Sequence, residues 1–219
     1  AGGVLAFGIP EYRLPSEVIA REIREIEKSG VNIFLNTEVG KDISFDQLRN
    51  ESHAIYVATG TQFPQRVGVP GEDLKGVLPG ISFLKDVKLK KNIDLTGHVV
   101  AVIGGGNTAI DSARTALRLG ARKVMVLYRR LRESMPAYDI EIEEALREGV
   151  ELHELVSPVR FVGDRRGRVT KIECVRRMMK DFDNNGRRNT VHIEGSNFFI
   201  DVDTVITAVS QYADLPFVR

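Results

Sequence analysis

The sequence is poor in cysteine, with Cys174 as the one cysteine among 219 residues. A single thiol cannot form an internal disulfide, and it cannot supply the several ligands that a zinc ion or an iron–sulfur cluster requires. Because Cys174 stands in a strand-like run over 170–177, we expect a thiol packed in the core. The scarcity of cysteine favours a cytoplasmic protein over a secreted, disulfide-bonded one.

An excess of charge and a long apolar run are also missing. The 31 basic and 30 acidic residues give a formal net charge of +1, so neither a nucleic acid nor a membrane is an expected partner. No apolar run reaches the roughly 20 residues of a membrane span. The opening residues 1–5 lack the charged region and the length of a signal peptide.

The sequence shows no arrangement typical of a metal site or a covalent catalytic site. Ser112 and Ser134 have no visible base partner, and Asp111 lies where an acid suits the start of a helix. The histidines are scattered without the spacing of metal ligands: His53, His98, His153 and His192. We therefore expect no catalytic side chain and no metal ligand in this chain.

What the sequence does contain is a glycine turn between a predicted strand and a predicted helix. An apolar run over 99–103 precedes the turn, and the helical spacing after it ends at Gly120. The turn reads Gly104, Gly105, Gly106, Asn107, Thr108 and Ala109. This order is typical of the phosphate-binding turn of a dinucleotide fold, where Gly104 allows the tight turn, Gly106 lets a pyrophosphate approach and Ala109 lets the helix pack closely. The alternative is a glycine turn with a purely structural role.

Arginines end the next predicted strand, which covers 124–128. An NAD site usually has an acidic residue at this position to bond the ribose 2′-hydroxyl, whereas this sequence has Arg129 and Arg130, followed by Arg132. Guanidinium groups bind the oxygens of a 2′-phosphate in paired, charge-assisted hydrogen bonds. The pattern favours NADP over NAD, and the alternative is a solvated basic turn.

Hydrophobic spacing and turn residues predict an α/β chain with a parallel sheet, crossover helices and an antiparallel β-meander. Besides the helix after the glycine turn, the predicted helices cover 16–29, 45–50, 81–87 and 138–148. The predicted strands outside the meander cover 31–35, 54–58, 99–103, 124–128, 150–155 and 203–209, and the strand over 54–58 is expected to be buried. The meander comprises 159–162, 169–179 and 190–194, with turns at 163–167 and 184–186, and 198–200 leads to the last strand.

Several short motifs, in the same order along nearly the whole chain, resemble one enzyme family. They are residues 2–15 (GGVLAFGIPEYRLP), 58–61 (ATGT), 70–72 (PGE), 104–111, 128–130 (YRR), 135–137 (MPA) and 208–211 (AVSQ). On these residues the chain resembles the small (beta) subunit of glutamate synthase and its relatives. Those relatives include the flavin part of dihydropyrimidine dehydrogenase and the NADH-dependent ferredoxin:NADP oxidoreductases.

The resemblance implies a Rossmann-like oxidoreductase that binds FAD and NADPH on two adjacent folds. It implies that NADPH passes a hydride to the flavin and that electrons leave through iron–sulfur centres of the protein's remainder or of a large subunit. Residues Gly104 to Thr108 would then hold the NADPH pyrophosphate, and Arg129 and Arg130 the 2′-phosphate. Further contacts implied with NADPH are Ala208, Val209 and Ser210, and those implied with FAD are Val4, Arg13, Val39, Ala58, Thr59 and Gly60.

The resemblance also implies a domain plan. Residues 1–63 correspond to part of the FAD-binding domain, 64–96 to an interdomain connection, 97–209 to the NAD(P)H-binding domain, and 210–219 to the start of the return to the FAD domain. The family's first glycine motif and its cluster cysteines are missing, and Ser210 stands where the family usually has glycine. We therefore expect this chain to be a piece of a longer enzyme. The isolated piece is expected to purify without stoichiometric FAD and to be inactive alone. The alternative is a non-catalytic NADP-binding or structural partner module.

Overall fold

The computed structural model describes residues 1–182 and 188–218, so the turn predicted at 184–186 lies outside the described residues. The chain forms two compact units. The larger unit is Pro64–Ser210, and the smaller one combines Ala1–Phe63 with Gln211–Arg219. No helix in the described residues is long and apolar enough to cross a bilayer.

A five-stranded parallel sheet forms the centre of the larger unit. Its strands, in spatial order, are β2 (Val77–Pro79), β10 (Thr204–Thr207), β3 (Val99–Ile103), β4 (Lys123–Tyr128) and β5 (Glu151–Glu154). All neighbouring pairs run parallel. The predicted parallel sheet is therefore confirmed, and residues 64–96, expected as a connection, supply β2 and α4 to this unit.

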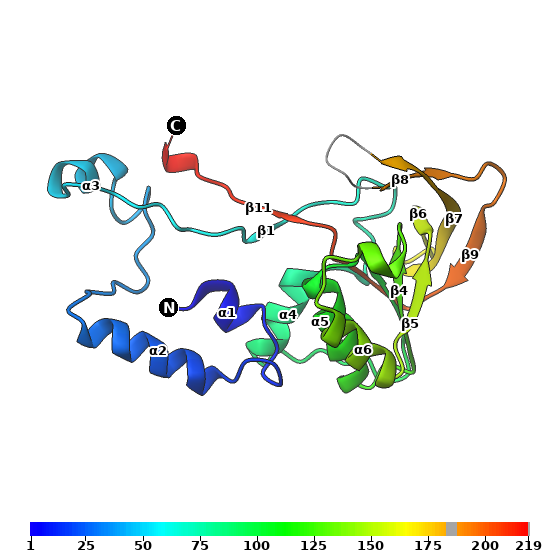
Figure 1. The fold of residues 1–219 in the computed structure, drawn as a ribbon, viewed down its shortest axis with the longest axis horizontal. Helices are drawn as coiled ribbons and strands as arrows, with labels where there is room; N and C mark the ends of the chain where they lie inside the picture. Colours follow the sequence, from blue (N-terminus) through cyan, green and yellow to red (C-terminus); the bar gives the residue numbers. More distant parts are fainter. Residues whose placement is uncertain (183–187, 219) are drawn as a thin grey trace. The chain divides into compact units, whose positions relative to one another are not determined.

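Three helices cover one face of the parallel sheet (Figure 1). They are α4 (Gly80–Lys88), α5 (Asn107–Arg118) and α6 (Asp139–Arg147), and a short 3₁₀ turn, η1 (Arg132–Ser134), precedes α6. Helix α5 presents Ala109, Ala113 and Ala116 to the sheet, and all three are fully buried. Such small side chains let the helix approach the strands closely, as predicted for Ala109.

An antiparallel sheet packs on the opposite face of the parallel sheet (Figure 1). It contains β6 (Val156–Gly163), β7 (Val169–Phe182), β8 (Arg188–His192) and β9 (Phe198–Asp201). Strand β7 pairs with β6, β8 and β9. Residues 198–200, expected only to lead to the last strand, thus form part of β9, because β7 is long enough to pair with several strands.

The strands of the parallel sheet contribute alternately to two hydrophobic cores. In β3, Val100 and Val102 pack among the helices, whereas Ala101 and Ile103 pack against the antiparallel sheet. This alternation follows from the two-residue repeat of side chains along a strand. Cys174 lies in the second core and is fully buried, as predicted. Burial, followed by the charge of Glu173, raises the pKa of Cys174 to about 12.

The smaller unit is mostly helix and irregular chain. Its elements are α1 (Gly3–Phe7), α2 (Ser16–Lys28), α3 (Phe45–Glu51), η2 (Pro216–Val218) and a two-stranded sheet of β1 (Phe63–Pro64) and β11 (Gln211–Tyr212). The predicted helices over 16–29 and 45–50 are confirmed. The strands predicted over 31–35 and 54–58 are wrong: neither range forms a strand, and Tyr56 is 93% exposed. An extended segment becomes a strand only with a hydrogen-bonded neighbour, and no described residue pairs with either range as a strand.

Candidate nucleotide-binding site

The glycine turn begins where β3 ends, and its first residue meets the last residues of the sheet. Gly104 has φ of +147°, and a Cβ at this position would lie 2.3 Å from the carbonyl oxygen of Ala208. The backbone of Ala208 follows β10 and donates its N–H to the Ile103 carbonyl at 2.8 Å. Only glycine permits this conformation and this approach. Gly104 and Ala208, both predicted to contact the cofactor, therefore lie together at one end of the sheet.

The second glycine rests on the aromatic ring of Tyr128, the last residue of β4. A Cβ on Gly105 would lie 2.4 Å from the Tyr128 ring. The Tyr128 hydroxyl donates to the Ser134 carbonyl at 2.7 Å, and the Ala137 N–H donates to the Gly105 carbonyl at 3.2 Å. The turn is thus held by β4 and by the segment before α6. Sequence reasoning assigned no role to Tyr128 or Ala137, although both stand in motifs that carry the resemblance.

The third glycine leaves open space at the start of α5. A Cβ on Gly106 would have the Cγ of Pro136 as its nearest neighbour, at 3.8 Å. Asn107 and Thr108 are the first residues of the helix, and the first turn, whose residues are all described, contains no acidic side chain. The first N–H groups of a helix have no partner within it, and the helix dipole is positive there. This end of α5 can therefore accept an anion such as a pyrophosphate.

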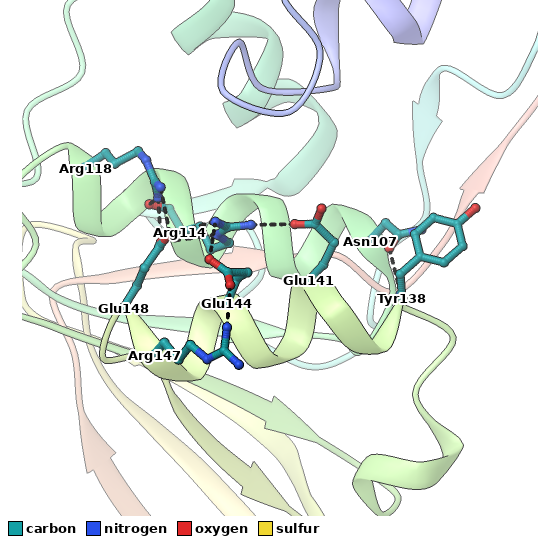
Figure 2. Close-up of polar contacts among 8 residues, drawn as sticks. All are labelled: Asn107, Arg114, Arg118, Tyr138, Glu141, Glu144, Arg147 and Glu148. Carbon is teal, nitrogen blue, oxygen red and sulfur yellow. Dashed lines mark hydrogen bonds and ion pairs between the residues drawn. The ribbon is translucent and has the colours of Figure 1, made fainter.

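The side chain of Asn107 connects the turn to the next helix. Its Oδ1 accepts a hydrogen bond from the backbone N–H of Tyr138, the residue before α6, at 3.1 Å (Figure 2). Asn107 was predicted as a cofactor-binding residue from its place in the turn. The structure adds a second role, because this bond holds the start of α6 beside the start of α5.

The predicted arginines follow β4 at the same edge of the sheet. Strands β3 and β4 are adjacent and parallel, with Ile103 opposite Leu127, so the turns that follow them lie side by side. Arg129 is exposed and Arg130 is half-buried. The Arg130 Nε donates to the Arg188 carbonyl at 3.0 Å. In the described residues, no carboxylate forms an ion pair with Arg129 or Arg130.

Arg132 differs from these two arginines because its side chain has an acidic partner. Its guanidinium lies 3.5 Å from a carboxylate oxygen of Glu143, and its backbone N–H donates to the Glu154 carboxylate. An arginine whose charge is already balanced attracts an anionic ligand less strongly. Arg129 and Arg130 are therefore the better candidates for a phosphate, while Arg132 stays a predicted contact.

A cluster of arginine–glutamate ion pairs, here called the ion cluster, joins α5 to α6 (Figure 2). Arg114 is 8% exposed and lies 2.5 Å from Glu141 and 2.7 Å from Glu148. Arg118 reaches the other oxygen of Glu148 at 2.7 Å. Hydrogen bonds from Arg118 and then Arg114 lower the pKa of Glu148 to about 2. Helix α5 is thus held against α6 by charge-assisted hydrogen bonds.

The remaining predicted residues fall into two groups. Val209 and Ser210 follow Ala208 in the larger unit, where Val209 is 42% exposed and the Ser210 carbonyl accepts a hydrogen bond from the Gln65 N–H at 3.0 Å. The residues predicted to contact FAD belong to the smaller unit: Val4 on α1, Arg13 before α2, Val39 in an isolated bridge with Ile43, and Ala58, Thr59 and Gly60 in an irregular segment. In the described part of that unit, no strand leads through a glycine turn into a helix, so these residues lie in separate segments.

No metal site was found in the described residues, where no three His, Cys, Asp or Glu side chains could hold one ion. Two of the four histidines have ordinary polar partners. His98 lies 3.0 Å from the Thr204 hydroxyl, and His153 lies 3.1 Å from the Glu151 carboxylate.

Comparison with known families agrees with this geometry. Residues 46–211 match the family described as pyridine nucleotide-disulphide oxidoreductase. The chain belongs to this family. The family domain binds FAD and NAD(P), so the predictions of an FAD- and NAD(P)-binding fold and of an oxidoreductase family are confirmed.

Curated relatives place the chain near several NADPH enzymes. It is 47% identical to the NADP(+)-dependent formate dehydrogenase subunit beta of Moorella thermoacetica, over 99% of this chain and 31% of the relative. It is 42% identical to the NADPH-Fe(3+) oxidoreductase subunit beta of Geobacter sulfurreducens, over 99% and 33%. It is 35% identical to the glutamate synthase [NADPH] small chain of Escherichia coli, over 94% and 46%. The resemblance to glutamate synthase small subunits is confirmed, and the chain spans only a third to a half of these relatives.

Solved structures confirm the Rossmann-like fold. Mycobacterium tuberculosis FprA in complex with NADPH matches with a TM-score of 0.81 at 20% identity, over 98% of this chain and 62% of that chain. The thioredoxin reductase of T. acidophilum matches with a TM-score of 0.62 at 17% identity, over 99% and 68%. At these identities the likeness establishes the fold of the chain.

Proposed function

We propose that this chain is the NADPH-binding portion of a flavin-dependent oxidoreductase similar to the glutamate synthase small subunit. In the whole enzyme a hydride would pass from NADPH to FAD, and electrons would continue to iron–sulfur centres. The observation that carries the proposal is the pair of turns after β3 and β4. One offers a helix N-terminus whose first turn has no acidic side chain, and the other offers two arginines without an ion-paired acid among the described residues.

The residues present fit the nucleotide in their chemistry. Gly106 and the first turn of α5 suit the pyrophosphate, because backbone N–H groups and the helix dipole favour negative charge there. Arg129 and Arg130 suit the 2′-phosphate, because a guanidinium binds phosphate oxygens in pairs. Hydride chemistry would be supplied by the two cofactors themselves, and this chain would hold and orient the nucleotide.

Several finer parts of the proposal rest on the relatives. The names of two relatives include NADP(+) or NADPH and "subunit beta", which supports NADPH as the ligand and a further subunit as a partner. The FAD contacts at Val4, Arg13, Val39 and Ala58 to Gly60 stay predictions, as do the domain plan, the iron–sulfur partner and the cytoplasmic location.

Nucleotide titration of arginine variants tests the proposal. We expect Arg129→Ala with Arg130→Ala to weaken NADPH binding by about 1–3 kcal/mol, because charge-assisted bonds to the 2′-phosphate are lost. NADH lacks that phosphate, so its dissociation constant should change little. Arg147→Ala is the matched control, since Arg147 is 71% exposed on α6 and, among the described residues, forms ion pairs with Glu143 and Glu144 of the same helix. Equal losses for NADPH and NADH would refute the 2′-phosphate role.

A further inference from the structure

Arg177, on β7, is a half-buried arginine held entirely by neutral partners. Its Nε donates to the Thr190 hydroxyl at 2.7 Å, one Nη donates to the Thr190 carbonyl at 2.6 Å, and the other donates to the Ser157 hydroxyl at 3.3 Å. Across residues 1–182 and 188–218, no carboxylate forms an ion pair with it. Arg114, by contrast, is surrounded by glutamates. The bonds of Arg177 fix its guanidinium in place and leave its positive charge uncompensated.

Backbone hydrogen bonds place Arg177 beside the arginine turn. The Leu155 N–H donates to the Arg130 carbonyl at 3.2 Å, and the Leu155 carbonyl accepts the N–H of Arg177 at 2.7 Å. Leu155 has φ of +56°, a left-handed conformation that costs a leucine about 1–2 kcal/mol. Such strain persists where the surrounding structure requires it. Here the strained Leu155 joins the turn after β4 to β7, because its N–H bonds to Arg130 and its carbonyl to Arg177.

The side chains of Arg130 and Arg177 reach the same strand. Arg130 bonds to the carbonyl of Arg188, and Arg177 bonds to Thr190, two residues further along β8. Burial lowers the pKa of Arg177, and the positive charges of Arg129 and Arg130 lower it further. The charges of Arg129 and Arg130 thus repel the charge of Arg177, and among the described residues no carboxylate forms an ion pair with any of the three. A bound anion of double charge would remove this repulsion.

We propose that Arg177 is a third specificity-determining residue for the nucleotide and donates hydrogen bonds to its 2′-phosphate together with Arg129 and Arg130. This inference rests on the proposed function and extends it from the parallel sheet to the antiparallel layer. An arginine has five N–H donors, and the three bonds to described residues leave two for phosphate oxygens. Thr190 and Ser157 would act as positioning residues, since they hold the guanidinium without neutralising it.

The neighbouring arginine supplies a matched control. Arg176 precedes Arg177 on β7, so its side chain points to the opposite face of the sheet, where its guanidinium lies 5.1 Å from the centre of the Phe198 ring. Arg176→Gln and Arg177→Gln each remove one positive charge from adjacent positions. A general electrostatic effect on the affinity for NADPH would be similar in the two variants. A direct contact with the 2′-phosphate would be lost only in Arg177→Gln.

Fluorescence titration of the full chain with NADPH and with NADH measures the difference. We expect Arg177→Gln to weaken NADPH binding about tenfold or more, as for a lost charge-assisted bond, and to leave NADH binding within about twofold. Arg176→Gln should leave both dissociation constants within about twofold. If Arg177→Gln does not fold, Arg177→Lys replaces it, because lysine keeps the charge without the planar pair of donors. The readout is again the ratio of the dissociation constants for NADPH and NADH.

The outcomes separate this inference from the proposed function. Equal effects of Arg176→Gln and Arg177→Gln, or equal effects of Arg177→Gln on NADPH and NADH, would overturn the inference. If only the Arg129 and Arg130 variants discriminate between the nucleotides, the proposed 2′-phosphate site stands without Arg177. If the Arg129 and Arg130 variants do not discriminate either, the proposed site itself fails.

Discussion

The ion cluster between α5 and α6 predicts how stability depends on one carboxylate. Glu148 receives hydrogen bonds from Arg114 and Arg118, and its side chain is 26% exposed. We predict that Glu148→Gln, which keeps the shape and removes the charge, destabilises the larger unit near neutral pH. The variant leaves Arg114, which is 8% exposed, with fewer acidic partners, and an under-compensated buried charge is unfavourable.

The lowered pKa sets the size and the pH range of the effect. The pKa falls from 4.5 to about 2, a difference of about 2.5, and each pKa unit corresponds to ~1.4 kcal/mol. The upper bound is therefore roughly 3.5 kcal/mol, and solvent screening around the partly exposed pair of Glu148 and Arg118 reduces it to about 1–2 kcal/mol. Because the folded-state pKa is depressed, this stabilisation is complete above 4.5 and is lost as the pH falls toward about 2.

Urea denaturation followed by circular dichroism, at a series of pH values from about 7 to about 3, measures this dependence. The free-energy gap between the two proteins should be widest near neutral pH and should narrow on acidification. Glu143→Gln is the control on the same helix, because Glu143 is 50% exposed and its ion pairs are long, at 3.5 and 3.7 Å. We expect less than about 0.5 kcal/mol there. A gap that stays constant down to about pH 3, or an equal effect of Glu143→Gln, would contradict this account of the cluster.

Two further predictions concern a glycine of the turn and the buried thiol of Cys174. Gly105→Ala should destabilise the chain by about 1–3 kcal/mol, because the new Cβ would lie 2.4 Å from the Tyr128 ring; denaturation measures this, and Gly106→Ala, with its nearest neighbour at 3.8 Å, should be nearly neutral for stability. Cys174 should react with a thiol reagent such as DTNB only when the chain unfolds, since it is buried and its pKa is about 12. Rapid reaction in the native state, without urea, would show that the thiol is accessible.

Local sequence patterns were sufficient for the elements that build the site. The order of apolar strand, glycine turn and alanine-rich helix predicted β3 and α5, and the arginines after 124–128 were placed correctly at the end of β4. These features depend on residues close together in sequence, where periodicity and turn chemistry act directly.

Features that depend on distant partners could not be predicted in this way. The ranges 31–35 and 54–58 have apolar, strand-like composition but no strand neighbour in the described structure. Arg177 reaches the arginine turn through Leu155 and the pairing of β7 with β8, and nothing in its own segment of sequence distinguishes it from Arg176. The contact of Gly105 with Tyr128 likewise needs two adjacent strands in register, which only the folded sheet provides.

The position of β10 has a consequence for the synthesis of the protein. This strand lies between β2 and β3, yet it is made about a hundred residues after β3, and its end supplies the Ala208 backbone against which Gly104 rests. Until Thr204–Thr207 leaves the ribosome, β2 and β3 have no strand between them, and the glycine turn lacks its contact with the Ala208 backbone. The glycine turn is therefore among the last parts of the larger unit to be completed, although it is translated before the antiparallel sheet. Because this closure joins residues far apart in sequence, it is expected to be slower than the folding of the helices.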